Sequence, residues 1–217
     1  MEMRNRQGIF LKGLRSEPGI RAGFRRDCVL ETLPNRAVLR ITARSYYRLY
    51  INGTFVCHGP ARTAHGYLRI DSLDVTRHLV KGKNCFAVEI ASYGEAFGGY
   101  SNEITCEPGL FLCELEADGE LLLQSDESWL GLRLSQVKSD AERMSHSRQL
   151  CERYVLDDNY RLWRTAEGKM LTETGLCAAT EVFSVQETLL DRGMAQPDFT
   201  ILENPRLLEH GSFRIDR

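Results

Sequence analysis

The sequence predicts an all-β protein, an antiparallel jelly-roll β-sandwich with few short helical turns. The first observation is a hydrophobic period of two across residues 28–125, which is typical of strands that bury one face. The second is a pair of hairpin signals, Asn52-Gly53 and Asp118-Gly119, each between two β-rich runs. The third is the recurrence of short β-rich runs about every 8–12 residues with turn residues between them, as in sandwiches.

The strands can be placed in order along the chain. Residues 37–44 alternate, with apolar side chains on one face and polar ones on the other, which predicts a half-buried strand. Hairpins follow around residues 46–59 and 110–125, with a strand at 84–92 between them and β-rich composition again at 148–157 and 179–185. The expected core contains Leu39, Ile41, Leu49, Phe86, Val88, Ile90, Leu112 and Trp129.

Helical signals are few. Residues 74–82 predict one or two turns, capped by Asp74 or Thr76 and ended by Gly82. Residues 135–150 place apolar side chains at helical spacing within a polar window, so they form either a short helix or a long loop. From Leu189 onward the pattern indicates an extended linker or an edge strand. We therefore divide the chain into an N-terminal arm at 1–19, a sandwich at 20–188 and a linker or edge segment at 189–217.

Composition excludes several classes of protein. The chain has 217 residues, 42% of them hydrophobic, and a net charge of -2, which argues against nucleic acid as the main partner. Basic residues gather only within residues 1–26, which we interpret as a solvated arm or a strand flanked by charge. No run approaches the roughly 20 apolar residues of a membrane span, and the N-terminus lacks the apolar core of a signal peptide. We expect a cytoplasmic protein without a membrane partner.

The cysteines agree with that compartment. There are 7, an odd number without C-x-x-C spacing, which favours reduced thiols. Cys85 and Cys113 lie inside apolar runs, where cysteine packs as a small hydrophobe. A zinc site, which needs clustered ligands, is not predicted.

Motifs for catalysis are weak. Glycoside hydrolysis needs two carboxyl groups that face one bond, and the local acidic pairs are Asp126-Glu127 and Asp157-Asp158. Neighbours on a strand point to opposite faces, so these pairs are expected to be turn or edge carboxylates. The same reasoning separates Cys57 from His58.

The segment 92–109 is the most informative loop, because it combines aromatic, amide and carboxylate side chains with glycines. Such groups suit a sugar, which stacks its C–H face and hydrogen-bonds its hydroxyls; alternatively, the aromatic rings pin the loop onto the sandwich. His65, in a segment after the first hairpin, is a candidate for the same end of the sandwich. The candidate sugar-binding residues are Tyr93, Glu95, Tyr100, Asn102 and His65.

Several segments resemble one family. The marks are residues 50–53 (YING), 59–62 (GPAR) and 74–76 (DVT), then Asp126 before Trp129, and Glu152, Asp157 and Trp163 in the following segment. Over roughly residues 20–200 the chain resembles the N-terminal β-sandwich of bacterial α-L-rhamnosidases of glycoside hydrolase family 78. The earlier marks are shared with galactose-binding-like jelly rolls of other glycosidases, and the later ones favour rhamnosidase.

The resemblance implies a non-catalytic domain. In that family the catalytic acids of an inverting reaction lie in a helical barrel, which has no counterpart in this sequence, so no catalytic residue is carried over. We expect no required cofactor. Some related domains bind rhamnose with calcium, so a structural calcium ion is left open. The expected role is to support a catalytic domain and to hold sugar, with rhamnose-containing glycans and that catalytic domain as partners. The alternatives are a free-standing, lectin-like carbohydrate-binding module and a small enzyme on a sandwich fold.

Overall fold

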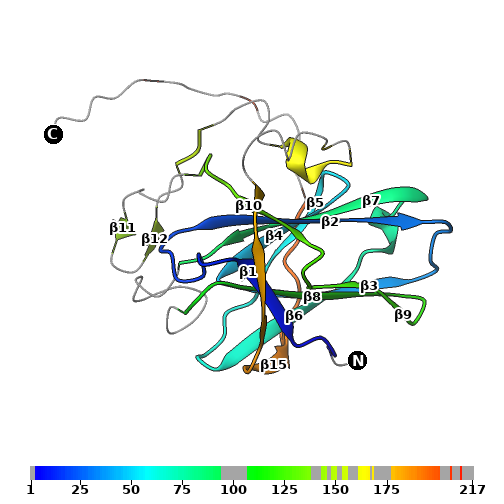
Figure 1. Ribbon diagram of the computed structural model, residues 1–217, viewed down its shortest axis with the longest axis horizontal. Helices are drawn as coiled ribbons and strands as arrows, with labels where there is room; N and C mark the ends of the chain where they lie inside the picture. The colour runs from blue at the N-terminus through cyan, green and yellow to red at the C-terminus, as the bar shows by residue number, and fades with distance from the viewer. Residues whose placement is uncertain are drawn as a thin grey trace.

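The computed structural model describes residues 3–93, 107–137, 143–145, 148–150, 153–155, 161–166, 168, 177–200, 206 and 211. Two β-sheets lie face to face and are seen edge-on in Figure 1, with β2 and β7 in one layer and β3 and β8 in the other. The predicted all-β sandwich is therefore confirmed. Strand pairs are antiparallel, except that β15 pairs with β6 in parallel.

The first sheet, called sheet A, has the order β14-β1-β8-β3-β6-β15, and β9 also pairs with β8. Its strands are β14 (Thr180–Ser184), β1 (Gln7–Leu11), β8 (Leu110–Ala117), β3 (Ala37–Arg44), β6 (Tyr67–Asp74), β15 (Thr188–Asp191) and β9 (Glu120–Gln124). Sheet B has the order β13-β10-β2-β7-β4-β5. Its strands are β13 (Cys177–Ala178), β10 (Leu130–Arg133), β2 (Arg21–Leu30), β7 (Gly82–Ala91), β4 (Tyr46–Ile51) and β5 (Thr54–Gly59).

Both predicted hairpin turns are present. Asn52 and Gly53 have φ angles of 52° and 81°, and Asp118 and Gly119 have 49° and 92°, as a type I′ turn requires at its two central positions. Asn52 also fixes the neighbouring strand, because its Oδ1 accepts a hydrogen bond of 2.9 Å from the Cys85 amide.

The predicted core residues are all buried, with exposed fractions of 0% to 3%. Seven of the eight lie between the sheets, where the Trp129 ring packs edge-on against Phe111 at 5.1 Å. Leu112 is different: it is buried on the outer face of sheet A, in a second cluster that includes Met3 and Val185. The chain ends thus add a layer outside part of this sheet.

That layer corrects the prediction of a half-buried β3. Arg40 and Arg44, expected to face solvent, are 5% and 3% exposed. Arg40 pairs with Glu114 at 3.0 Å, and Arg44 pairs with Glu107 at 3.0 Å and with Glu187. The local alternation was wrong about exposure, because the carboxylates that pair with these arginines come from β8 and from segments far away in the sequence.

The basic N-terminal stretch contains a strand. β1 lies within residues 1–19 and pairs with β14 along its whole length, and its Ile9, Phe10 and Leu11 are 0% exposed. Of the two interpretations of this stretch, the strand flanked by charge is confirmed. At the other end, β15 runs across the expected division between residues 188 and 189.

Of the two segments with helical signals, only residues 74–82 form a helical turn in the described part of the chain, and it is short. A 3-10 turn covers Thr76–His78, and Asp74 Oδ1 accepts hydrogen bonds from the amide and hydroxyl of Thr76. Within 135–150 the helical alternative is wrong, because β11 (Arg143–Ser145) and β12 (Arg148–Leu150) pair as antiparallel strands. A second 3-10 turn, Leu162–Arg164, packs Trp163 on the outer face of sheet B.

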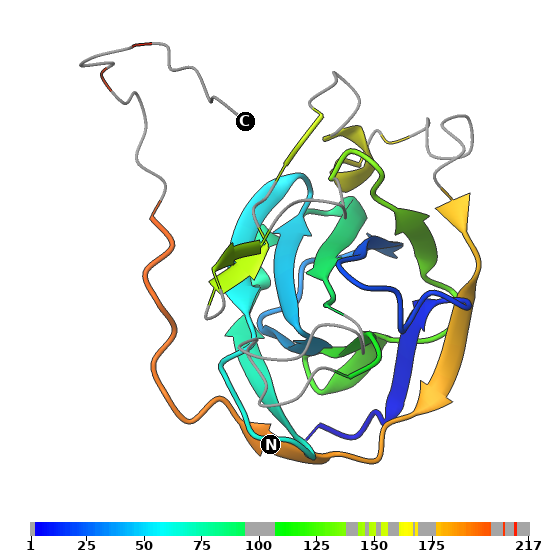
Figure 2. The same ribbon diagram turned by 90° about the vertical axis from the view of Figure 1, so that its left-hand side faces the viewer.

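Residues 188–200, here called the C-terminal strap, run from sheet A to the edge of sheet B (Figure 2). After β15 the Arg192 guanidinium contacts the fully buried Asp71 carboxylate at 2.6 Å. Further on, the Phe199 ring packs against Phe55 and His58 on β5, with centroid distances of 5.8 and 4.9 Å. The strap is thus anchored at both of its ends.

Burial disfavours the thiolate form of the core cysteines. Cys57, Cys85 and Cys113 are buried, and this burial raises the pKa of Cys57 and Cys85 to about 12 and that of Cys113 well above its usual value. Since the thiolate is the nucleophile, we expect these three to resist iodoacetamide at neutral pH while the exposed Cys177 is alkylated. Peptide mass spectrometry of native and urea-denatured samples measures this. Native labelling of Cys113 at the denatured rate would contradict the packing described.

Candidate functional site

A cleft of about 330 Å³ opens on the outer face of sheet B. We call it the sheet B cleft; its lining includes Arg21, Tyr46, Arg48, His58, Glu89, Ala91 and Tyr93. Strand register assembles it, because Tyr46 and Arg21 lie on either side of Ala91, and Arg48 lies between Glu89 and His58. Residues two apart on a strand share a face, so Tyr46 and Arg48 on β4 lie on the same face as Glu89 and Ala91 on β7. Tyr47 on β4 also reaches the lining. The small Ala91 side chain leaves the hollow between the two strands.

Two tyrosines form an aromatic wall of the cleft. The rings of Tyr46 and Tyr93 meet edge-on, with centroids 6.1 Å apart and an interplanar angle of 87°. Tyr46 is half-buried, whereas Tyr93 is only 6% exposed. Edge-to-face pairs of this kind are stabilising. Tyr46 therefore presents the more accessible ring to a ligand.

A buried carboxylate lies beside this wall. Glu89 is 3% exposed; its Oε2 is 3.1 Å from Arg164 Nη2, and its Oε1 is 3.9 Å from Arg48 Nη1. The Arg164 guanidinium also stacks over the Tyr50 ring at 4.2 Å, and Arg48 donates to the Tyr154 hydroxyl at 3.2 Å. These contacts fix a hydrogen-bond acceptor and cationic donors at the edge of the hollow.

His58 stands at the β5 side of the cleft. Partial burial lowers the pKa of the largely exposed His58, and the positive charges of Arg48 and Arg192 lower it further. Its imidazole is therefore neutral at pH 7, with one nitrogen that donates and one that accepts. Because His58 also contacts Phe199, the C-terminal strap adjoins this wall.

The residues predicted for sugar binding are only partly brought together. Tyr93 lines the cleft, whereas His65 does not; its side chain is 66% exposed and pairs with Glu107, at the end of the 92–109 segment. Glu95, Tyr100 and Asn102 lie outside the described residues. His65 therefore contacts the last part of this segment on the side of Arg44 rather than in the cleft.

The sequence did not single out Tyr46, Arg48, His58 or Glu89 as site residues. One usable signal was Glu89, an isolated charge in the apolar run 84–92. Another was the spacing of Tyr46 and Arg48, which puts both on one face of β4. Cys57 and His58 do point to opposite sides of β5, as expected from their adjacency, with Cys57 buried and His58 exposed.

Asp126, of the acidic pair at 126–127, has a structural role. Asp126 Oδ1 accepts hydrogen bonds from the Ser128 amide and hydroxyl, and the Trp129 indole donates to the Gln124 carbonyl at 2.8 Å. The aspartate that precedes this tryptophan therefore shapes a turn. Asp157 and Asp158 lie outside the described residues. Within the described part of the chain, no three His, Cys, Asp or Glu side chains gather as metal ligands, so we derive no calcium site from it.

Comparison with known proteins gives a structural match. No family model and no curated protein matches the sequence. A family 78 rhamnosidase of Bacillus sp. GL1 aligns over 90% of this chain with a TM-score of 0.74 and 24% identity. The α-L-rhamnosidases of Aspergillus terreus and Streptomyces avermitilis align over 83% and 82%, with TM-scores of 0.59 and 0.52 and identities of 21% and 17%.

This match defines the fold. The chain is a β-sandwich of the type that occurs within α-L-rhamnosidases, and it spans 20%, 21% and 14% of those three chains. Among the described residues there is no helix with the length and apolar character to cross a bilayer.

Proposed function

We propose that this chain is the non-catalytic N-terminal β-sandwich of an α-L-rhamnosidase-like glycoside hydrolase, and that it holds sugar in the sheet B cleft. The observation that carries the proposal is the structural alignment over 90% of the chain, at a TM-score of 0.74, with about a fifth of a family 78 rhamnosidase. In this proposal the chemistry belongs to a separate catalytic region, and the sandwich supports that region.

The cleft supports the sugar-binding part of the proposal. Its 330 Å³ lies within the range of roughly 300–1,000 Å³ that small-molecule sites occupy. The Tyr46 ring offers an apolar face for the C–H groups of a pyranose. Glu89 offers a hydrogen-bond acceptor and Arg48 a donor for the hydroxyl groups of the sugar. In small-molecule sites, a few polar groups of this kind fix the orientation of a ligand that packs against apolar and aromatic side chains.

The domain by itself is expected to be inactive on rhamnosides. Inverting hydrolysis needs two carboxyl groups, roughly 6.5–9.5 Å apart, on either side of the bond. Glu89 is the one carboxylate among the described residues that line the cleft, and Arg164 already holds it. We expect no release of phenol from an aryl α-L-rhamnoside above the buffer rate. Turnover that disappears in Glu89→Gln or Glu95→Gln would overturn the non-catalytic assignment.

Binding of L-rhamnose is expected with a dissociation constant of about 1 mM or weaker, because a monosaccharide offers few atoms to offset the loss of its freedom. Replacing the stacking ring in Tyr46→Leu should weaken binding about 3- to 10-fold, the range that a lost aromatic contact represents. Calorimetric titrations with and without calcium measure both effects. Tyr67→Leu is the matched control, because Tyr67 is an exposed tyrosine on β6 that is absent from the cleft lining.

Equal affinity of wild type and Tyr46→Leu, at unchanged thermal stability, would remove the cleft from the proposal. Preference for galactose over rhamnose would favour a lectin-like module. The reading frame beyond the codon for Arg217 separates the two roles: a helical barrel encoded there supports the domain of a hydrolase, and a stop codon supports a free-standing module.

A further inference from the structure

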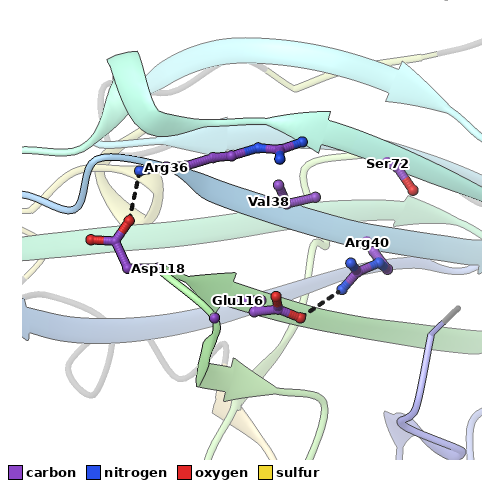
Figure 3. Close-up of a pocket in the computed structure, with 7 residues that line it drawn as sticks. Arg36, Val38, Arg40, Ser72, Glu116 and Asp118 are labelled. Carbon is purple, nitrogen blue, oxygen red and sulfur yellow. Dashed lines mark hydrogen bonds and ion pairs between the residues drawn. The ribbon is translucent and has the colours of Figure 1, made fainter. Parts of the chain in front are cut away.

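A second hollow lies on the opposite side of the sandwich, on the outer face of sheet A. It has a volume of about 490 Å³, and we call it the sheet A groove (Figure 3). Its lining includes Arg36, Val38, Arg40, Ser72, Glu116 and Asp118. These come from β3 and the residue before it, from β6, and from β8 with its turn. The layer formed by the chain ends covers the part of this sheet around Leu112 and Val185, and the groove occupies another part.

Strand register explains the shape of the groove. Val38 lies between Asp74 and Glu116, and the next row places Arg40 between Ser72 and Glu114. Val38 is thus an apolar floor with polar side chains around it. The rim at one end is fixed, because the Asp118 carboxylate accepts hydrogen bonds from the amides of Asn35 and Arg36 at 3.0 and 2.9 Å.

Some of the polar groups are engaged and others are available. Arg40 is 5% exposed, and its Nη1 donates hydrogen bonds to Glu114 at 3.0 Å and to Glu116 at 3.4 Å. By contrast, the Arg36 guanidinium and the Ser72 hydroxyl have no hydrogen bond to any part of the chain that the structure describes. Figure 3 shows the Arg36 side chain extended over Val38 in the direction of Ser72. Two exposed groups that can donate therefore face the same apolar floor.

The charges of the lining select the kind of ligand. Two guanidinium groups, of Arg36 and Arg40, face the carboxylates of Glu116 and Asp118 in the lining. A further carboxylate, of Asp74, lies across from Val38 and interacts electrostatically with Arg36. An anion that approached Arg36 would also meet these carboxylates, and a cation would meet the guanidinium groups. A neutral ligand with adjacent hydroxyl groups can bind to both the guanidinium groups and the carboxylates, since a hydroxyl accepts from a guanidinium and donates to a carboxylate.

We propose that the sheet A groove binds a neutral polyhydroxylated ligand of the size of one sugar residue, with its C–H face on Val38. Arg36 and Ser72 donate to its hydroxyl oxygens, and Glu116 and Asp118 accept from its hydroxyl groups. This site is separate from the sheet B cleft and does not depend on it. Because the described residues of the lining include no aromatic ring, we expect its affinity for a monosaccharide to be about millimolar or weaker.

The test is a titration of the ¹⁵N-labelled chain with L-rhamnose and, separately, with methyl β-D-galactopyranoside, sodium D-galacturonate and choline chloride. We expect one of the two neutral sugars to shift the amide signals of Val38, Ser72 and Gly119 in a saturable way. Arg36→Gln and Ser72→Ala should each weaken this binding at least about 3-fold. The matched control is Arg77→Gln, which removes another surface arginine outside the groove and should leave the titration unchanged.

Three results would overturn the proposal. The first is no shift of these amides up to about 100 mM sugar. The second is tighter binding of galacturonate or choline than of either neutral sugar, and the third is equal sugar affinity of Arg36→Gln and wild type. Shifts at Ala91 and Glu89 without shifts in the groove would overturn this proposal and leave the sheet B cleft standing. Shifts in the groove alone would support it and remove the cleft from the proposed function.

Discussion

Replacing Arg192 by methionine is expected to lower the free energy of unfolding by about 3–5 kcal/mol, because it leaves the Asp71 carboxylate buried without a charged partner. Asp71 is 0% exposed; its Oδ1 lies 2.6 Å from Arg192 Nη1, and its Oδ2 accepts a hydrogen bond from the Tyr47 hydroxyl. The surroundings are tightly packed, since a Cβ built on Gly59 would lie 2.1 Å from Asp71 Oδ2.

Urea unfolding of wild type and Arg192→Met measures this loss. Arg62→Met, which removes an arginine from an exposed position, should change the free energy of unfolding by less than about 0.5 kcal/mol. The double variant Asp71→Asn/Arg192→Met should regain part of the loss, because no unpaired charge is then buried. Arg192→Met should also raise hydrogen exchange in the C-terminal strap. A loss below about 1 kcal/mol would contradict the buried ion pair.

Phe86→Ala is expected to cost about 3–5 kcal/mol through the lost burial and the cavity left behind. Phe86 is 1% exposed and lies on β7, between β2 and β4, where it is paired with Arg26 and Ile51. Strands on both sides hold its backbone, so the site cannot collapse to fill the space. The same urea titration measures the effect.

Leu121→Ala is the control for this core substitution, because Leu121 is 58% exposed on β9 and should change stability by less than about 0.5 kcal/mol. A Phe86→Ala variant that unfolds within about 1 kcal/mol of wild type would show that the space between the sheets is not close-packed at this position.

The fold could be predicted to the extent that its signals are local. The alternation in residues 37–44 predicts which side chains face inward, because a strand has a period of two. The Asn52-Gly53 dipeptide predicts where the chain reverses, because a type I′ turn needs positive φ at both positions. The burial of Arg40 and Arg44 carries no such signal. Arg44 is buried by its pairing with Glu187 and Glu107, which lie far along the chain. Arg40 is buried by its pairing with Glu114, whose other carboxylate oxygen accepts from the amides of Arg4 and Asn5.

The candidate site illustrates the same limit. Aromatic and polar composition directed attention to the 92–109 loop, of which Tyr93 does line the cleft. Tyr46, His58 and Glu89 belong to three different strands, and they meet because β5, β4 and β7 pair in a particular register. A shift of one residue would turn each side chain to the other face, so composition alone does not identify this set.

Amide chemical shifts of the ¹⁵N-labelled protein can locate L-rhamnose on the chain directly. We expect saturable shifts at Tyr46, Arg48, Glu89 and Ala91, which line the sheet B cleft, with half-saturation at about 1 mM or above. The same shifts should be lost or strongly reduced in Tyr46→Leu. Unchanged signals at all four positions up to about 100 mM L-rhamnose would contradict the claim that this domain holds sugar in the cleft.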